Sequence, residues 1–341
     1  MEVTSRALDL GETRSVGVED RSQVSSVRRV AGDLAEALGF DEAAAGRVAL
    51  VVTELATNVL KHAGRGEILL GAAQTAAGRF VEIAALDHGP GMANVSQCFE
   101  DGYSTAGSPG TGLGAVRRLA ASLDVYSRST GTAILARLGA GADPPAGAWP
   151  LGGLSVPCRG EERCGDAWDR EVRSGVVSLL VADGLGHGAG AAEAALECVR
   201  AFRHHAGEPP AARVETLHAA LRATRGAAVA VAELDAGRRI LRFAGLGNIA
   251  AAVHGDGLAR HLVSHHGTAG HTARKIAEYT YPWPARGVLV MHSDGVASRR
   301  DLDPYPGLIE RDPGLVAAVL YRDFSRRRDD ATVVVARSSA A

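Results

Sequence analysis

Aspartates at the ends of apolar runs are the first candidates for chemistry in this chain of 341 residues. Asp183-Gly184 closes the run GVVSLLVA, and Asp294-Gly295 closes the run RGVLVMHS. Asp166 precedes the first run, and Asp329-Asp330 introduces a last run, ATVVVAR. Any one Asp-Gly pair is better explained as a turn. Together, however, converging carboxylates would repel one another unless Mg²⁺ or Mn²⁺ neutralised them, and two such ions can activate water against a phosphoryl group.

The sequence argues against two other kinds of site, a cysteine-based phosphatase and a zinc site. Cys164 and Arg170 stand in the spacing C-x-x-x-x-x-R, but the intervening Asp166 and Asp169 would repel a phosphate and raise the thiol pKa. The histidines also lack zinc-site spacing; these are His187, His204, His205, His265 and His266.

In the first half, a long helical segment carries polar side chains on an otherwise apolar sequence. Glu54 and Asn58 stand at i and i+4, with Lys61 and His62 one turn later, so Glu54 and Asn58 share a face. Asn58 could ligate Mg²⁺, and Glu54 could act as a base or orient water. For this segment alone, a capped or solvated helix face is the better explanation.

Two glycine-rich segments follow this helix. Asp87-His88-Gly89-Pro90-Gly91 comes directly after an apolar run, where a carboxylate can accept a hydrogen bond from an exocyclic amine such as that of adenine. The sequence GTGLG at 110–114 opens the helical segment AVRRLAASL, and glycine N–H groups beside a helix N-terminus can bind phosphate. Each segment alone fits an ordinary turn or loop, and no G-K-[ST] of a P-loop is present.

The order E-x-x-x-N, D-x-G-P-G, G-T-G-L-G and Gly131-Thr132 resembles the GHKL ATPase family over residues 20–138, specifically the small anti-sigma-factor serine kinases and their switch-kinase relatives. The resemblance implies that Asn58 binds Mg²⁺, Glu54 is the catalytic carboxylate and Asp87 binds adenine. It also implies an ATP site formed by Gly89, Gly91, Gly110, Thr111, Gly112, Leu113, Gly114 and Thr132. No histidine-bearing dimerisation helix pair precedes these motifs, which argues against a sensor histidine kinase.

The motifs GDAW at 165–168, ADGLGHG at 182–188, SDG at 293–295 and DDAT at 329–332 resemble the PPM protein serine/threonine phosphatases, in their SpoIIE-like branch. The resemblance covers residues 150–338 and implies a dinuclear site with Asp183 and Asp294 as catalytic residues. Its metal ligands would be Asp166, Asp183, the Gly184 carbonyl, Asp294 and Asp329, and either Asp329 or Asp330 could fill the last place. Arg159 and Arg163 are the candidates for binding the substrate phosphate.

Hydrophobic periodicity predicts the elements that position these residues. Val27, Val30, Leu34 and Leu38 have helical spacing before Gly39, and a second helix spans 42–63. Strand-like runs then predict an α+β chain, and the Pro/Gly-rich stretch 139–153 predicts a linker between domains at 1–138 and 154–341. The resemblances imply a GHKL (Bergerat) α/β sandwich followed by a PPM-type αββα sandwich.

Composition excludes several classes of protein. Hydrophobic residues make up 46% and charged residues 22%, which is enough for packed cores. A formal net charge of −2 argues against nucleic-acid binding. Four scattered cysteines, no apolar run of 18 residues and no secretory signal predict a cytoplasmic protein that does not bind membranes; the cysteines are Cys98, Cys158, Cys164 and Cys198.

The two resemblances together predict a bifunctional regulator that uses ATP, Mg²⁺ and Mn²⁺. They imply that the phosphatase acts on phosphorylated STAS-domain antagonist proteins in sigma-factor or stressosome control. Relatives of the first domain often dimerise, which makes a homodimer a further expectation. The alternative is a first domain that does not transfer phosphate and instead binds a partner such as a sigma factor, or gates the attached phosphatase with ATP.

Overall fold

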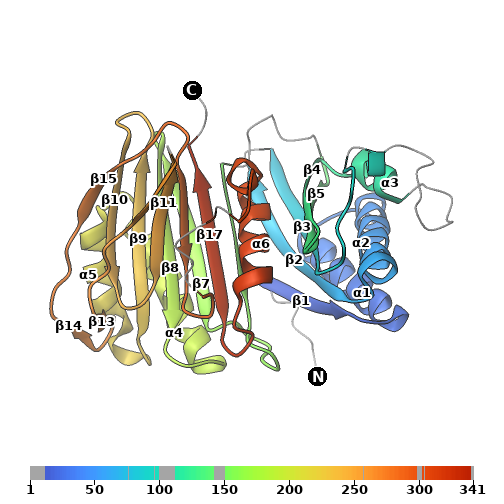
Figure 1. Cartoon of the computed structure of the whole chain (residues 1–341). Coiled ribbons are helices and arrows are strands. Elements are labelled where there is room, and N and C mark those ends of the chain that lie inside the picture. Colours follow the sequence, from blue (N-terminus) through green and yellow to red (C-terminus); the bar gives the residue numbers. More distant parts are fainter. Residues whose placement is uncertain are drawn as a thin grey trace, which may run out of the picture. The chain divides into compact units, whose positions relative to one another are not determined.

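The computed structural model describes residues 12–75, 77–95, 97–99, 112–141, 150–255, 257–297, 302 and 304–338. The chain divides into two compact units, Met1–Trp149 and Pro150–Ala341 (Figure 1). Each unit has its own sheets and its own hydrophobic core.

The first unit is a five-stranded antiparallel sheet with helices on one face. Its strand order is β1-β2-β3-β5-β4, formed by β1 (Thr13–Val18), β2 (Gly66–Thr75), β3 (Gly78–Asp87), β4 (Ser122–Arg128) and β5 (Gly131–Gly139). The helical elements are α1 (Arg21–Ala37), α2 (Glu42–Ala63), the short η1 (Gln97–Phe99) and α3 (Gly112–Leu119).

Local signals fix the ends of the two long helices. Asp20 caps α1 by accepting from the N–H groups of Ser22 and Gln23, while the Gln23 side chain accepts from the N–H of Asp20. Gly64 ends α2 in the left-handed conformation, with φ +75°. By length and composition α2 could cross a membrane, but its apolar side lies in the core of this unit.

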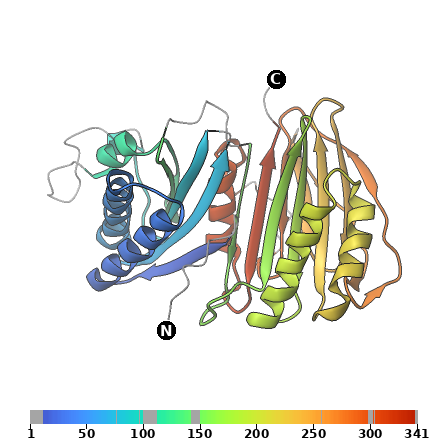
Figure 2. The same ribbon diagram turned by 180° about the vertical axis from the view of Figure 1, so that it is seen from behind.

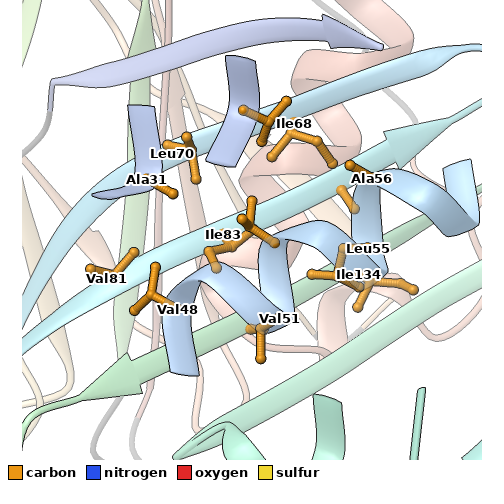
Figure 3. Packing of buried hydrophobic residues seen from close by; sticks show 14 of the residues in the cluster. Ala31, Val48, Val51, Leu55, Ala56, Ile68, Leu70, Val81, Ile83 and Ile134 are labelled. Atoms are coloured by element: carbon orange, nitrogen blue, oxygen red, sulfur yellow. The ribbon is translucent and has the colours of Figure 1, made fainter. Parts of the chain in front are cut away.

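Branched aliphatic and alanine side chains form the core between the helices and the sheet. Figure 3 shows Val48, Val51 and Leu55 of α2 meeting Ile83 and Ile134 of the sheet. Because successive strand residues point to opposite faces, the inward residues of β2 and β3 alternate with residues of the other face.

The second unit has two five-stranded antiparallel sheets stacked face to face. One has the order β15-β10-β9-β8-β7, with β7 (Asp166–Arg173), β8 (Val176–Gly184), β9 (Ala227–Asp235), β10 (Ile240–Leu246) and β15 (Tyr279–Pro282). The other has the order β12-β11-β16-β17-β6, with β6 (Leu151–Val156), β11 (Ala250–Gly255), β12 (Leu258–His261), β16 (Val288–His292) and β17 (Ala331–Arg337). A small pair, β13 (Gly267–Thr268) and β14 (Thr272–Ala273), completes the strands.

Helices cover the outer faces of both sheets of this unit. Helices α4 (Ala189–His204) and α5 (Pro210–Ala220) pack on the first sheet, as Figure 2 shows from behind. Helix α6 (Pro313–Phe324) packs against β6 and β17 of the second sheet. The short turns η2 (Leu221–Ala223) and η3 (Leu308–Glu310) lie in the connections. The predicted α+β class and the αββα sandwich are therefore confirmed.

The structure differs from the sequence prediction at several elements. Gly139 belongs to β5, and Leu151, Gly152 and Gly153 belong to β6, although all lie in the predicted linker. A Cβ on Gly152 would lie 2.4 Å from the Gly314 nitrogen, so glycine here lets α6 approach the strand. The predicted helix AVRRLAASL ends at Leu119, and its last residues begin β4.

Candidate functional site

The carboxylates of Asp166 and Asp183 lie side by side at one end of the first sheet of the second unit. Asp166 begins β7 and pairs directly with Asp183 of β8 in antiparallel register. Residues paired in this way point to the same face, and like charges in such a pair are destabilising. Gly184 follows Asp183, and a Cβ there would lie 2.3 Å from the Ala191 carbonyl oxygen, at the first turn of α4.

The second sheet brings the remaining aspartates to the same place. Asp294 follows β16, Asp329-Asp330 precedes β17, and these two strands pair with each other. The link to the first sheet is a hydrogen bond from the Asp294 backbone N–H to the Asp183 carboxylate. The carboxylates predicted from separate motifs therefore gather where the ends of the two sheets meet.

Asp166 is the most deeply enclosed member of this cluster. It is 4% exposed, and the hydroxyls of Ser293 and Thr332 hydrogen-bond to its carboxylate. Its Oδ2 atom is buried and has no hydrogen-bond partner among the described residues. Burial, followed by the charge of Asp183, raises the Asp166 pKa well above its usual range. A buried carboxylate oxygen with no proton donor is suited to a cation.

Repulsion also acts on the other carboxylates of the cluster. Burial and then the charges of Asp294, Asp329 and Asp330 raise the pKa of Asp183 to about 7. Burial and Asp329 also raise the pKa of Asp294, while Arg326 lowers it. This donor set, made of oxygen atoms with excess negative charge, fits Mg²⁺ or Mn²⁺.

The carboxylates alone would not supply a complete set of ligands for such ions. In the described part of the chain, no three His, Cys, Asp or Glu side chains form a metal-binding group by themselves. Mg²⁺ in proteins keeps several waters and uses one or two carboxylates, so the Gly184 carbonyl and water are suitable further ligands.

The structure gives Asp329 and Asp330 different surroundings. Asp330 is 2% exposed; its Oδ1 accepts from the Cys158 N–H at 2.7 Å and its Oδ2 from the Gly165 N–H at 2.9 Å. Both of its oxygens therefore hold the loop that precedes β7. Asp329 is more exposed, and its Oδ1 accepts from the Asp330 N–H at 3.0 Å, its one hydrogen bond with the described residues. This arrangement favours Asp329 as the ligand.

Three supporting residues were not given roles by the sequence analysis. Ser293 and Thr332 lie within the SDG and DDAT motifs, but only the fold shows that both contact Asp166. Asn248 donates from Nδ2 to Asp294 Oδ2 at 2.7 Å, and it comes from the connection before β11, with no motif to mark it. Arg159 is exposed and Arg163 is half-buried. Arg170 lies within the extended strand β7 rather than in a phosphate-binding loop.

In the first unit, the shared face of α2 meets the beginning of α3. A Cβ placed on Gly112 would lie 3.1 Å from Glu54 Oε2 and 3.8 Å from Asn58 Nδ2, so glycine keeps this approach open. The Asn58 Nδ2 atom is buried and has no hydrogen-bond partner among the described residues. Leu113 packs against the core and Gly114 is buried. Gly110 and Thr111 lie outside the described residues.

The residues predicted on the adenine side also lie together. Asp87 Oδ1 accepts from the N–H of Gly89 at 2.8 Å and from the N–H of Thr132 at 3.1 Å. The Thr132 hydroxyl lies 2.8 Å from that of Ser127, which accepts from the Met92 N–H. Gly91 has φ +76°, and a Cβ there would lie 2.0 Å from the Arg128 carbonyl oxygen. A rigid turn thus surrounds Asp87.

The raised pKa of Asp183 makes a prediction for the metal-free protein. Folded Asp183 keeps its proton up to about pH 7, whereas an unfolded aspartate loses it near pH 4. The folded state therefore binds more protons in this window, and stability falls as pH rises. Asp183→Asn should stabilise the EDTA-treated protein by about 2 kcal/mol more at pH 7.5 than at pH 5.

Urea unfolding at the two pH values measures this difference. Trp168 and Trp283 are buried in the second unit and report on its unfolding by fluorescence. An equal effect of Asp183→Asn at both pH values would contradict the raised pKa.

Substitutions at Asp329 and Asp330 should have different effects. Asp329→Asn should weaken Mn²⁺ binding about tenfold or more without lowering the melting temperature of the metal-free protein, because it removes a charge that repels Asp183 and Asp294. Asp330→Asn should lower that melting temperature, because an amide cannot accept from both backbone N–H groups and a buried unpaired N–H costs about 1–3 kcal/mol. Titration calorimetry and thermal unfolding test this pair, and the reverse pattern would assign the ligand to Asp330.

Comparisons with known proteins match each unit separately. Residues 18–138 match the family model described as "Histidine kinase-like ATPase domain", and residues 173–339 match that of "Stage II sporulation protein E (SpoIIE)". The serine/threonine-protein kinase RsbT of Bacillus subtilis is 33% identical over 96 residues, which cover 28% of this chain and 72% of RsbT.

Solved structures are similar over about half of the chain. A chain from a study of the bacterial stressosome is 26% identical, with a TM-score of 0.52, covering 55% of this chain and 98% of its own length. RsbX in complex with magnesium is 20% identical, with a TM-score of 0.48, covering 55% and 94% respectively.

The matches confirm both predicted resemblances. This chain belongs to the family of histidine kinase-like ATPases that includes RsbT, and it joins that domain to a SpoIIE domain, which makes it a metal-dependent protein serine/threonine phosphatase.

Proposed function

We propose that this protein is a two-activity switch that removes phosphate from a STAS-domain antagonist protein and can also transfer phosphate from ATP to such a protein. The observation that carries the phosphatase assignment is the gathering of carboxylates from both sheets around the unpartnered Oδ2 of Asp166. The likeness to RsbT supports the kinase assignment, and the stressosome structure supports this class of partner.

In the proposed phosphatase site, two divalent ions would be held by the Gly184 carbonyl and by the carboxylates of Asp166, Asp183, Asp294 and Asp329. When bound, Mg²⁺ or Mn²⁺ supplies an activated water and stabilises negative charge on the phosphoryl group. Neighbouring side chains hold these carboxylates in position. The hydroxyls of Ser293 and Thr332 hydrogen-bond to Asp166, and the Asn248 amide donates to Asp294. Asp330 holds the loop from Cys158 to Gly165 against the site.

In the proposed ATP site, each group of residues contacts a different part of the nucleotide. Asp87 would accept from the adenine amine, and the Thr132 N–H donates to this carboxylate and holds it in position. Asn58 would bind Mg²⁺ through its amide oxygen, its unpartnered Nδ2 would donate to a ligand oxygen, and the glycines at 110, 112 and 114 would contact the phosphates. Glu54 lies beside Gly112, where it can accept the proton of an attacking serine or threonine hydroxyl.

The proposed STAS-domain substrate also indicates where the protein would act. We place the protein in the cytoplasm, where alternative sigma factors and stressosomes are controlled, and we expect its first unit to form homodimers. The opposing activities would let one chain set the phosphorylation state of the antagonist protein.

The phosphatase assignment predicts loss of activity on removal of a ligand. With Mn²⁺, Asp183→Asn and Asp294→Asn should each lower the rate on an aryl phosphate and on a phosphorylated STAS protein at least 100-fold. EDTA should have the same effect on the wild type. Glu215→Gln, an exposed change on α5, is the matched control and should retain full activity. Wild-type turnover of the aryl phosphate without turnover of any phosphorylated STAS protein would overturn the substrate assignment.

The kinase assignment predicts that transfer depends on Glu54 while ATP binding does not. Glu54→Gln should reduce transfer of labelled phosphate from ATP to a STAS protein at least 100-fold and change ATP affinity less than threefold. Glu36→Gln, on the exposed face of α1, serves as the control.

Two results would contradict the kinase proposal. If the wild type binds ATP but labels no protein, and ATP changes the phosphatase rate, the first unit is a regulatory module. Equal transfer by wild type and Glu54→Gln would remove Glu54 from the mechanism.

A further inference from the structure

The basic triplet Arg326–Arg328 lies beside the carboxylate cluster and has no role in metal binding. Its position is set by backbone contacts with the segment after Asp294. The Arg326 N–H donates to the Gly295 carbonyl at 2.8 Å, and the Ala297 N–H donates to the Phe324 carbonyl at 2.9 Å. An antiparallel bridge joins Val296 to Ser325 between these bonds. The start of the triplet is therefore held next to Asp294.

The middle arginine of the triplet is turned back onto α6. Arg327 has φ +58°, its N–H donates to Ser325 Oγ, and its guanidinium donates to the Tyr321 hydroxyl at 2.9 Å. The guanidinium also lies 4.7 Å from the centre of the Tyr321 ring. These contacts fix the turn, and they occupy Arg327 within the chain.

The outer two arginines remain available to a partner. Arg326 and Arg328 are exposed, and neither forms an ion pair with any described residue. Arg328 directly precedes Asp329, and the backbone of Arg326 is hydrogen-bonded to Gly295, the residue after Asp294. The backbones of both exposed arginines therefore start at the edge of the carboxylate cluster.

We propose, on the basis of the phosphatase function above, that Arg326 and Arg328 determine specificity by binding acidic side chains next to the phosphorylated serine or threonine of the substrate protein. The phosphate itself is taken by the metal-binding cluster. The substrate residues on either side of the phosphorylated residue would then pass Arg326 and Arg328. A guanidinium group can form two parallel hydrogen bonds to a carboxylate. Such exposed charge pairs are modest singly and weaken with salt.

The test compares matched phosphopeptides on wild-type protein and the Arg326→Gln/Arg328→Gln double variant, with Mn²⁺ at low ionic strength. One peptide has Asp and Glu beside its phosphoserine, and the other has Asn and Gln at the same positions. The wild type should prefer the acidic peptide about fivefold in kcat/KM, through KM, and the double variant should lose this preference. The activity of the double variant on an aryl phosphate, which has no flanking residues, should fall less than threefold.

Arg286→Gln is the control, because this exposed arginine lies at the opposite end of β16 from Asp294. It should keep the wild-type preference. A wild type without preference, or a double variant that retains it, would overturn the proposal. An equal loss on the aryl phosphate would instead assign the arginines to the phosphate itself.

Failure of the phosphatase function is distinguished by a binding measurement. Fluorescence polarisation with non-hydrolysable phosphonate versions of both peptides reads the preference without turnover. A wild type that hydrolyses nothing but still binds the acidic phosphonate more tightly, in a manner dependent on Arg326 and Arg328, would refute the activity and support the docking role. Equal binding of the two phosphonates would refute the docking role.

Discussion

Mutual repulsion among buried carboxylates is the constraint on which the second unit depends. Asp166 and Asp183 are forced into direct opposition by the register of β7 and β8, and Asp294 reaches the same point from the other sheet. In isolation this arrangement destabilises the fold, as the raised pKa values of all three groups indicate. At the proposed metal site, divalent cations would neutralise this repulsion, and stability and catalysis would then be linked through the metal.

Much of the surrounding structure serves to hold this cluster together. Both oxygens of Asp330 are used to bind backbone N–H groups of one loop, and glycine is required at positions 165, 184 and 295 because a Cβ there would meet neighbouring atoms at 2.5 Å or less. The strand pair β16–β17 places Ser293 and Thr332 behind Asp166. Repulsive groups are thus kept near one another by neutral hydrogen-bonding groups.

In the first unit, backbone N–H groups and a glycine also hold the polar side chains of the predicted site in place. Asp87 is held by two N–H groups, and Glu54 and Asn58 are brought against the start of α3 by a residue without a side chain. Among the described residues, the unpartnered Asn58 Nδ2 is a donor that suits a ligand oxygen, whereas the unpartnered Asp166 Oδ2 of the second unit is an acceptor that suits a cation. In each unit a buried polar atom lacks a partner at the place where the motifs predict a ligand.

The sequence alone determined the two families, the α+β class and most of the ligand candidates, because glycines and carboxylates occur in ordered motifs and the hydrophobic periods of α2, β8 and β16 are strong. It did not reveal β6, whose glycines resemble a linker, because their packing against α6 and Trp168 is a tertiary contact. Only the tertiary structure distinguished Asp329 from Asp330, since two adjacent aspartates are equivalent in sequence and differ in what their oxygens contact. It alone also placed Asn248 and Arg326 at the site, because side chains far apart in the chain acquire shared chemistry only when strand pairing brings them together.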